Sequence, residues 1–205
     1  MRPILPALAA LAVLAPAALP AVPALAAATV GQAAPAFTGT DSKGRSVSLA
    51  ALRGRTVVLE WTNAECPFVV KHYGSGNMQR LQAAAARDGV VWLTINSGAP
   101  GKQGHVSGPQ ADAIMAREKA APAHYLLDPA GTIGRAYGAT TTPHMFVIDA
   151  RGTMVYAGGI DDRPTANAAD IPGARNFVAL ALADLAAGRP VATPTARPYG
   201  CSVKY

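Results

Sequence analysis

The sequence predicts an α/β fold in which a central mixed β-sheet is covered by helices on both faces. Strand-like apolar segments alternate with helix-like segments between residues 57 and 137, the order expected when strands and helices form separate layers. Residues 57–61 are a short, mostly apolar run, typical of a strand buried on both faces. Residues 145–149 and 154–158 flank an Ala-Arg-Gly turn and predict a closing antiparallel hairpin.

The other elements follow from turn and capping signals. Gly74 and Gly76 are expected to break a helical segment that runs from residue 68 to residue 87. Ser107 is expected to cap the next helix. The remaining predicted elements are a hairpin at 40–49, strands at 90–95 and 125–128, and helices at 110–120, 132–137 and 174–187.

The first 26 residues predict a secretory signal peptide that precedes the fold. Arg2 supplies a short positive region, residues 5–19 are almost wholly Ala, Leu, Val and Pro, and residues 24–26 offer a small-residue cleavage site. Cleavage after Ala28 fits the same rule. An uncleaved membrane anchor is the alternative, but three prolines keep each apolar run well below the roughly 20 residues of a span. We expect an exported protein, periplasmic or extracellular, without stable membrane insertion after cleavage.

Residues 27–187 are expected to form one domain, and residues 188–205 a Pro-rich extended tail. The formal net charge is +6, but the basic residues are scattered and not interleaved with aromatic ones. No nucleic-acid motif is visible. The charge therefore predicts a solvated basic surface and excludes a nucleic-acid partner.

Cys66 is the residue most informative about function. It follows the predicted strand at 57–61, and Pro67 after it suits the first position of a helix. We therefore expect Cys66 at a helix N-cap, where unpaired amides and the helix dipole stabilise an anion. A thiol there ionises readily, and the thiolate is the nucleophile. The alternative is a buried cysteine that packs as a small hydrophobe.

Three segments, residues 57–70, 128–138 and 142–149, together resemble the thioredoxin-like superfamily. They are most similar to its alkyl hydroperoxide reductase/thiol-specific antioxidant branch, the redoxins. Residues 159–164 and the ending Gly-Cys-Ser-Val-Lys-Tyr resemble a peroxiredoxin-like subgroup of that branch. The resemblance implies a thioredoxin-like fold with Cys66 at the nucleophilic position. It also implies that Pro143, after Thr142, is a cis proline packed beside Cys66.

Two features depart from the family patterns. Val69 stands where thioredoxins carry the second cysteine of Cys-x-x-Cys, so dithiol exchange within one motif is excluded. Peroxiredoxins carry Pro-x-x-x-Thr/Ser-x-x-Cys, and here Leu59 and Asn63 replace the Pro and the Thr. Thr62 is one residue out of register and would point to the opposite face. Asn63 is a candidate to hold a bound oxygen, or else to stabilise the turn.

Cys201, the second of two cysteines, is the candidate resolving thiol. A sulfenate on Cys66 would condense with a second thiol to a disulfide, and the compartment expected for an exported chain lets a disulfide persist. A permanent structural disulfide and an intermolecular pairing are the alternatives, and the sequence leaves all three open.

Several residues are candidates to assist Cys66. Lys71 and His72 follow it by just over one helical turn and are candidates to add positive charge, or else are simply solvated. In the implied fold His144 lies near Cys66, where an imidazolium would lower the pKa of the thiol. Arg163 is chosen over Arg175 as the arginine that steadies the thiolate in the resembled peroxiredoxins.

Cys66, His72 and His144 also form a candidate soft metal site. No metal-ligand spacing is present in the sequence, so we expect no metal. No organic cofactor is implied either, because electrons would arrive through thiols.

The sequence thus predicts an exported, monomeric or weakly dimeric redoxin. It would reduce a hydroperoxide, or exchange disulfides with a protein partner, through Cys66 with Cys201 resolving. The alternative is a non-catalytic thioredoxin-like module that binds a metal or a protein partner and carries a structural Cys66–Cys201 disulfide.

Overall fold

Strand β3 (Val57–Trp61) lies at the centre of the molecule, and all five of its residues are buried. It pairs in parallel with β4 (Val91–Asn96) and antiparallel with β7 (His144–Ile148). β4 pairs in parallel with β5 (His124–Leu127), and β7 forms a hairpin with β8 (Met154–Gly158). The apolar runs in β3 and β4 fit strands whose two faces are both covered.

A hairpin of β1 (Thr38–Asp41) and β2 (Ser46–Ser48) extends the sheet beyond β5. The resulting strand order is β2-β1-β5-β4-β3-β7-β8. This computed structural model describes residues 28–205, so the expected signal peptide at 1–26 lies outside the described residues. The predicted mixed α/β sheet is confirmed.

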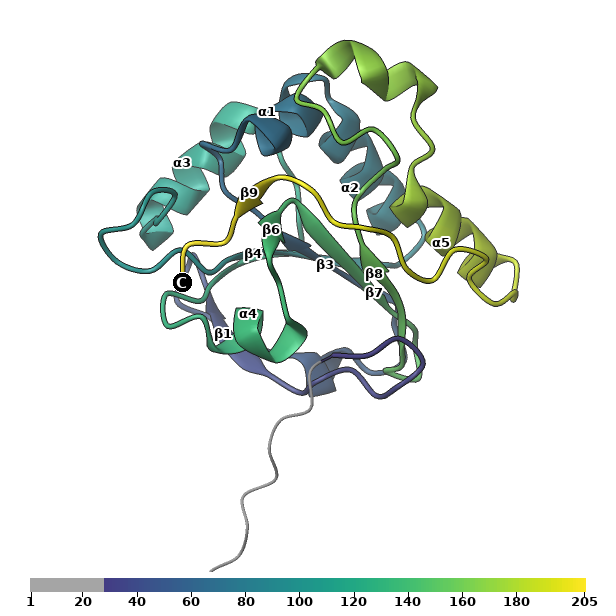
Figure 1. Ribbon diagram of the computed structural model, residues 1–205. Coiled ribbons are helices and arrows are strands. Elements are labelled where there is room, and N and C mark those ends of the chain that lie inside the picture. The colour runs from purple at the N-terminus through teal and green to yellow at the C-terminus, as the bar shows by residue number, and fades with distance from the viewer. Residues whose placement is uncertain (1–27) are drawn as a thin grey trace, which may run out of the picture.

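Helices cover both faces of the sheet (Figure 1). One face carries α1 (Pro67–Gly74), α2 (Asn77–Arg87) and α5 (Phe177–Ala186), which pack around residues such as Trp92 and Tyr156. α3 (Gly108–Glu118) lies beside α2, where Gln79 Nε2 donates a hydrogen bond to Glu118 O.

The opposite face carries α4 (Thr132–Tyr137) and the short 3₁₀-helix η1 (Leu49–Leu52). Trp61, Tyr137 and Phe146 form an aromatic cluster there, with ring centroids 5.2–5.6 Å apart. Among the described residues, no helix is long and apolar enough to cross a membrane.

The predicted helix break and cap are both present. α1 ends at Gly74 and α2 begins at Asn77, because Gly76 between them adopts a left-handed conformation (φ +73°) that interrupts the helix. Ser107 is the N-cap of α3, and its N–H donates to Gln110 Oε1 at 2.8 Å.

The tail at 188–205 is more ordered than the sequence predicted. Its β9 (Cys201–Ser202) pairs antiparallel with β6 (Thr141–Thr142) to form a separate two-stranded sheet. In Figure 1 the tail runs from the end of α5 past the hairpin β7–β8 to the edge beside α4. The 3₁₀-helix η2 (Ala168–Gly173) was also not predicted.

Candidate active site

Cys66 is the N-cap residue of α1, as the sequence predicts. Its backbone is extended (φ −78°, ψ 122°), and its carbonyl accepts hydrogen bonds of 2.9 Å from the N–H groups of Val69 and Val70. Pro67 opens the helix, where the missing N–H leaves nothing unpaired. The side chain is fully buried. The thiol therefore lies where free amides and the helix dipole favour an anion.

Three segments that are distant in sequence meet at the Cys66 sulfur. The thiol donates a hydrogen bond to the Thr142 carbonyl at 3.1 Å, and the N–H of Cys201 donates to Sγ at 3.4 Å. The Thr142–Pro143 peptide bond is cis, as the resemblance implied. Both cysteines are free thiols. Because 135 positions separate Cys66 from Cys201 in sequence, only the tertiary fold brings them together.

Strand pairing fixes the position of Cys201. Thr142 and Cys201 are partners in the β6–β9 register, and Thr142 Oγ1 donates to Cys201 O at 3.4 Å. Gly200 permits this approach, because it has φ +131° and a Cβ there would lie 2.0 Å from the Thr142 carbonyl oxygen. The N–H of Val203 donates to Thr140 O at 3.0 Å and continues the pairing.

The two cysteines differ in acidity. Burial acts to raise the pKa of Cys66, but hydrogen bonds from the side chains of Cys201 and Thr142 and from the N–H groups of Cys201 and Val69 hold it below its usual value. Burial, the hydrogen bond to Cys66 and the charge of its thiolate raise the pKa of Cys201 to about 11. Cys66 is therefore the more acidic thiol of the pair, and Cys201 the less acidic one.

Two tyrosines hold the tail on either side of Cys201. The ring of Tyr199 packs edge-on against Phe68 at 5.8 Å between centroids, and Lys71 Nζ lies 5.6 Å from the centre of the same ring. The hydroxyl of Tyr205 donates to Ala139 O at 2.7 Å. The sequence predicts a role for neither tyrosine, because an isolated aromatic residue in a polar tail carries no local signal of where it packs.

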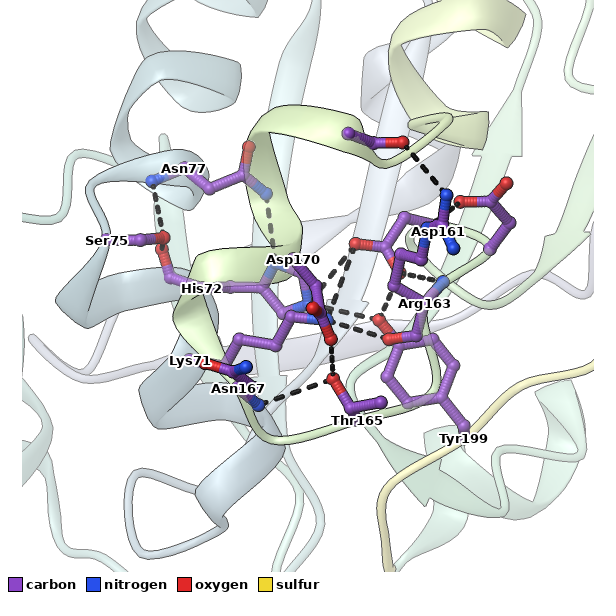
Figure 2. A network of polar contacts seen from close by, with 12 residues as sticks. Lys71, His72, Ser75, Asn77, Asp161, Arg163, Thr165, Asn167, Asp170 and Tyr199 are labelled. Atoms are coloured by element: carbon purple, nitrogen blue, oxygen red, sulfur yellow. Dashed lines mark hydrogen bonds and ion pairs between the residues drawn. The ribbon is translucent and has the colours of Figure 1, made fainter.

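A buried polar cluster lies beside Tyr199 (Figure 2). Lys71 Nζ donates to Arg163 O at 2.7 Å and lies 3.9 Å from Asp161 Oδ2, and the Lys71 and Asp161 side chains are 0% and 1% exposed. His72 Nε2 lies 3.2 Å from the Tyr199 hydroxyl, which donates to Asp161 Oδ1. Burial lowers the pKa of His72 to about 4 although Asp161 opposes the shift, so the ring is neutral at neutral pH. The prediction that Lys71 and His72 direct charge at Cys66 is wrong, because both face Asp161.

The expected roles of two other basic residues also need correction. Burial lowers the pKa of His144 to about 4, so its ring is neutral and supplies no imidazolium to Cys66. Instead, His144 Nδ1 accepts a hydrogen bond from Thr140 N at 3.3 Å. Among the described residues, the polar partners of the Arg163 side chain are Asp162 and Gly173. Its Nε lies 3.6 Å from Asp162 Oδ1, and its Nη2 donates to Gly173 O. Arg163 contributes to the site region through its backbone carbonyl, which Lys71 uses.

Asn63 has the turn-stabilising contacts that were the alternative to oxygen binding. Its Oδ1 accepts from Glu65 N at 2.9 Å, and its Nδ2 donates to Gln103 Oε1 at 3.0 Å. Thr62 is buried, and its N–H donates to Ile95 O. Among the described residues, no hydrogen bond links the side chain of either residue to Cys66. Neither side chain therefore takes the place of the peroxide-holding hydroxyl in this arrangement.

Glu60 is a buried acid that the sequence analysis passed over within an apolar strand. Its carboxylate accepts hydrogen bonds from Tyr73 and Trp92 at 2.8 Å, from Thr94 at 3.1 Å and from Gln82 at 3.5 Å. Burial raises the pKa of Glu60 to about 7, and these donors limit the rise. Within residues 28–205, no group of three His, Cys, Asp or Glu residues is arranged to hold a metal ion.

Known proteins are similar to this chain in sequence and in fold. The family described as the AhpC/TSA family matches residues 30–157. A hypothetical protein from Sinorhizobium meliloti 1021 is 25% identical over 88% of this chain and 96% of its own, with a TM-score of 0.72. An uncharacterized conserved protein from Geobacillus kaustophilus is 28% identical over 86% of this chain and 92% of its own, also with a TM-score of 0.72.

A secreted Mycobacterium tuberculosis disulfide oxidoreductase, homologous to E. coli DsbE, is 22% identical over 67% of this chain and 92% of its own. Its TM-score is 0.51, and the likeness is one of fold. No curated protein matches the chain. These similarities confirm the thioredoxin-like fold that the resemblance implied.

Proposed function

The chain belongs to the AhpC/TSA family, and on that basis we propose that it is an exported thiol oxidoreductase in which Cys66 is the nucleophile and Cys201 the resolving thiol. The observation that carries the proposal is the contact of Cys201 N–H with Cys66 Sγ at 3.4 Å. A resolving thiol must reach the sulfur that has reacted, and strand β9 already holds Cys201 against it.

Thiol–disulfide exchange is the reaction that the site supports best. The Cys66 thiolate attacks a disulfide of a protein partner, forms a mixed disulfide and releases one partner thiolate. Cys201, after losing its proton, then attacks Cys66 Sγ, releases the second partner thiolate and leaves a Cys66–Cys201 disulfide. The partner gains the two electrons that the cysteine pair loses. An external thiol reductant returns the pair to its reduced state.

Hydroperoxide reduction is the second candidate, and membership of the AhpC/TSA family favours it. The Cys66 thiolate would attack the terminal peroxide oxygen, form a sulfenic acid and release the alcohol or water. Cys201 would then condense with the sulfenic acid to a disulfide and release water. The missing hydroxyl at Asn63 argues for slow reduction, because the peroxide would lose a hydrogen-bond donor that the family pattern supplies.

One experiment separates the two reactions. The reduced protein, residues 28–205, is mixed in stopped flow with hydrogen peroxide or with a cystine-containing peptide, and the Cys66→Ser variant is the control. We expect the disulfide to oxidise Cys66 faster than it oxidises free cysteine at the same pH. Rates no faster than those of free cysteine for both oxidants, or equal loss of thiols in Cys66→Ser, would contradict the proposal.

Export is part of the proposal and has its own test. It rests on the signal-like pattern of residues 1–26 and is consistent with a structural relative whose name describes it as secreted. The full chain is expressed in a Gram-negative host, and its N-terminus is determined by mass spectrometry of the periplasmic fraction. A mature N-terminus near residue 27 or 29 is expected. Retention of the intact chain in the cytoplasm contradicts export.

A further inference from the structure

The Cys66 sulfur is closed off by the tail of its own chain. The Cys66 side chain is 0% exposed, and Tyr199 and Cys201 pack against the apolar cluster that contains it. The Cys201 N–H lies against the sulfur itself. A partner disulfide or an external reagent therefore reaches Cys66 only when this part of the tail moves away.

Tyr199 joins the tail to the helix that Cys66 caps. It lies two positions before Cys201, and its ring contacts Phe68 and Lys71, both on α1. Its hydroxyl donates to Asp161 Oδ1 and lies 3.2 Å from His72 Nε2 (Figure 2).

The direction of each hydrogen bond in this cluster follows from its neighbours. The Asn77 amide donates to His72 Nδ1 at 2.9 Å, so in the neutral ring Nε2 carries the proton. That proton points to the Tyr199 oxygen, whose own proton goes to Asp161. If Tyr199 leaves, His72 Nε2 and Asp161 Oδ1 both lose a partner at a buried site, which is unfavourable until water replaces it.

The same cluster also favours reversible opening of the tail. Lys71 and Asp161 are almost fully buried, and burying an ion pair costs desolvation energy that opposes closing. Among residues 28–205, Asp161 Oδ2 has no hydrogen-bond partner, and the Lys71 and His72 nitrogens lie 3.9 Å from it. Opening lets water reach these groups, while closing restores the Tyr199 contacts. The loss of the Tyr199 hydrogen bonds therefore opposes opening, and the desolvation of the Lys71–Asp161 ion pair opposes closing. A segment that opens and closes reversibly needs both effects.

We infer that Tyr199 is a positioning residue and the latch of the tail: it holds Cys201 over Cys66, and its release admits the partner. This inference rests on the proposed function of the cysteine pair. Release of the latch makes Cys66 more accessible and at the same time makes Cys201 less well placed. The two cysteines should therefore respond in opposite directions when the hydroxyl is removed.

A single reagent measures both responses. The Cys66 thiolate attacks the disulfide of 5,5′-dithiobis(2-nitrobenzoate), forms a mixed disulfide and releases one thionitrobenzoate. Cys201 then attacks Cys66 Sγ, releases the second thionitrobenzoate and closes the Cys66–Cys201 disulfide. The rate of the first step depends on the reagent concentration and the rate of the second does not. The time course of thionitrobenzoate absorbance therefore separates the two steps. Cys201→Ala, in which only the first step is possible, assigns the phases.

The test compares Tyr199→Phe with a matched control. Tyr199→Phe keeps the ring and removes the hydroxyl, whereas Tyr137→Phe removes a hydroxyl that bonds to Pro35 O, outside the polar cluster at Tyr199. We expect Tyr199→Phe to make the first step about 5- to 10-fold faster and the second slower by a similar factor, as for the loss of one or two hydrogen bonds. Tyr137→Phe should leave both steps unchanged.

Other outcomes overturn the latch. Rates in Tyr199→Phe equal to those of the natural chain, a change of both steps in one direction, or the same change in Tyr137→Phe would each do so. Hydrogen exchange gives a second readout, in which Tyr199→Phe should speed exchange in peptides from residues 199–205 and leave β3 and β4 unchanged. A natural chain that releases only one thionitrobenzoate contradicts Cys201 as the resolving thiol, and the first step still tests the latch because it needs no Cys201.

Discussion

Thr142 and Cys201 face each other in the two-stranded sheet β6–β9, and both bond to the same sulfur. The Thr142 carbonyl accepts from the Cys66 thiol, and the Cys201 N–H donates to it. A strand of only two residues thus connects the cis-proline loop, the start of α1 and the tail.

The first prediction concerns the acidity of Cys66. Among the hydrogen bonds that lower the pKa of Cys66, the one from the Cys201 side chain has the largest effect. Cys201→Ala should therefore raise that pKa. The thiolate absorbance in the ultraviolet, titrated against pH in reduced protein, measures it, with Cys66→Ser as the baseline. Equal midpoints before and after the substitution would show that the Cys201 thiol does not act on Cys66.

The second prediction concerns a Cys66–Cys201 disulfide. Closing the 135-position loop should raise the free energy of unfolding by about 5 kcal/mol in the chain-entropy model. Urea unfolding of oxidised and reduced protein measures the difference, and Cys201→Ala should show none. A cycling pair should also be reduced by mild dithiol. A bond that resists such reductant would favour the structural disulfide instead.

The third prediction concerns Gly200. Gly200→Ala would bring a methyl group to 2.0 Å from the Thr142 carbonyl oxygen and force β9 away from β6. Such overpacking typically costs about 1–3 kcal/mol, so we expect disulfide closure at least about fivefold slower. Gly188→Ala is the control, because Gly188 lies in the same tail with φ +67° but has nothing within 4 Å of a Cβ. Equal slowing in both variants would assign the effect to backbone strain alone.

The fourth prediction concerns Glu60 and pH. Its pKa is raised from 4.5 to about 7, so its contribution to stability is present below the unfolded pKa and is lost as pH rises through the folded one. The free energy of unfolding of the natural chain, relative to that of Glu60→Gln, should therefore fall by about 2–3 kcal/mol from pH 5 to pH 8. The opposite contributions of His72 and His144 cancel in this difference. Urea unfolding at several pH values measures it, and a constant difference would contradict a raised pKa.

Much of the fold was predictable because its signals are local. Pro67 after Cys66 marks the helix start, Gly76 marks the break after α1, and Ser107 marks the start of α3. The alternation of strands and helices gave the mixed sheet, and the pattern around Pro143 gave the likeness to redoxins.

The site was less predictable because it depends on contacts between distant residues. The pairing of Thr142 with Cys201 involves two short strands without any periodic pattern. The prediction of a charge on His144 failed because burial keeps the ring neutral. The residues next to His144 in sequence do not reveal that it is buried. Lys71 was placed on the correct helix, but its partner Asp161 lies far along the chain.

The place of β9 in the chain also sets an order of assembly. Every strand of the seven-stranded sheet precedes it in sequence, and chains emerge from the ribosome N-terminus first. The sheet and α1 are therefore all earlier in the chain than the segment that covers Cys66. Until β9 pairs with β6, the Cys66 thiol lacks the cover that Tyr199 and Cys201 provide.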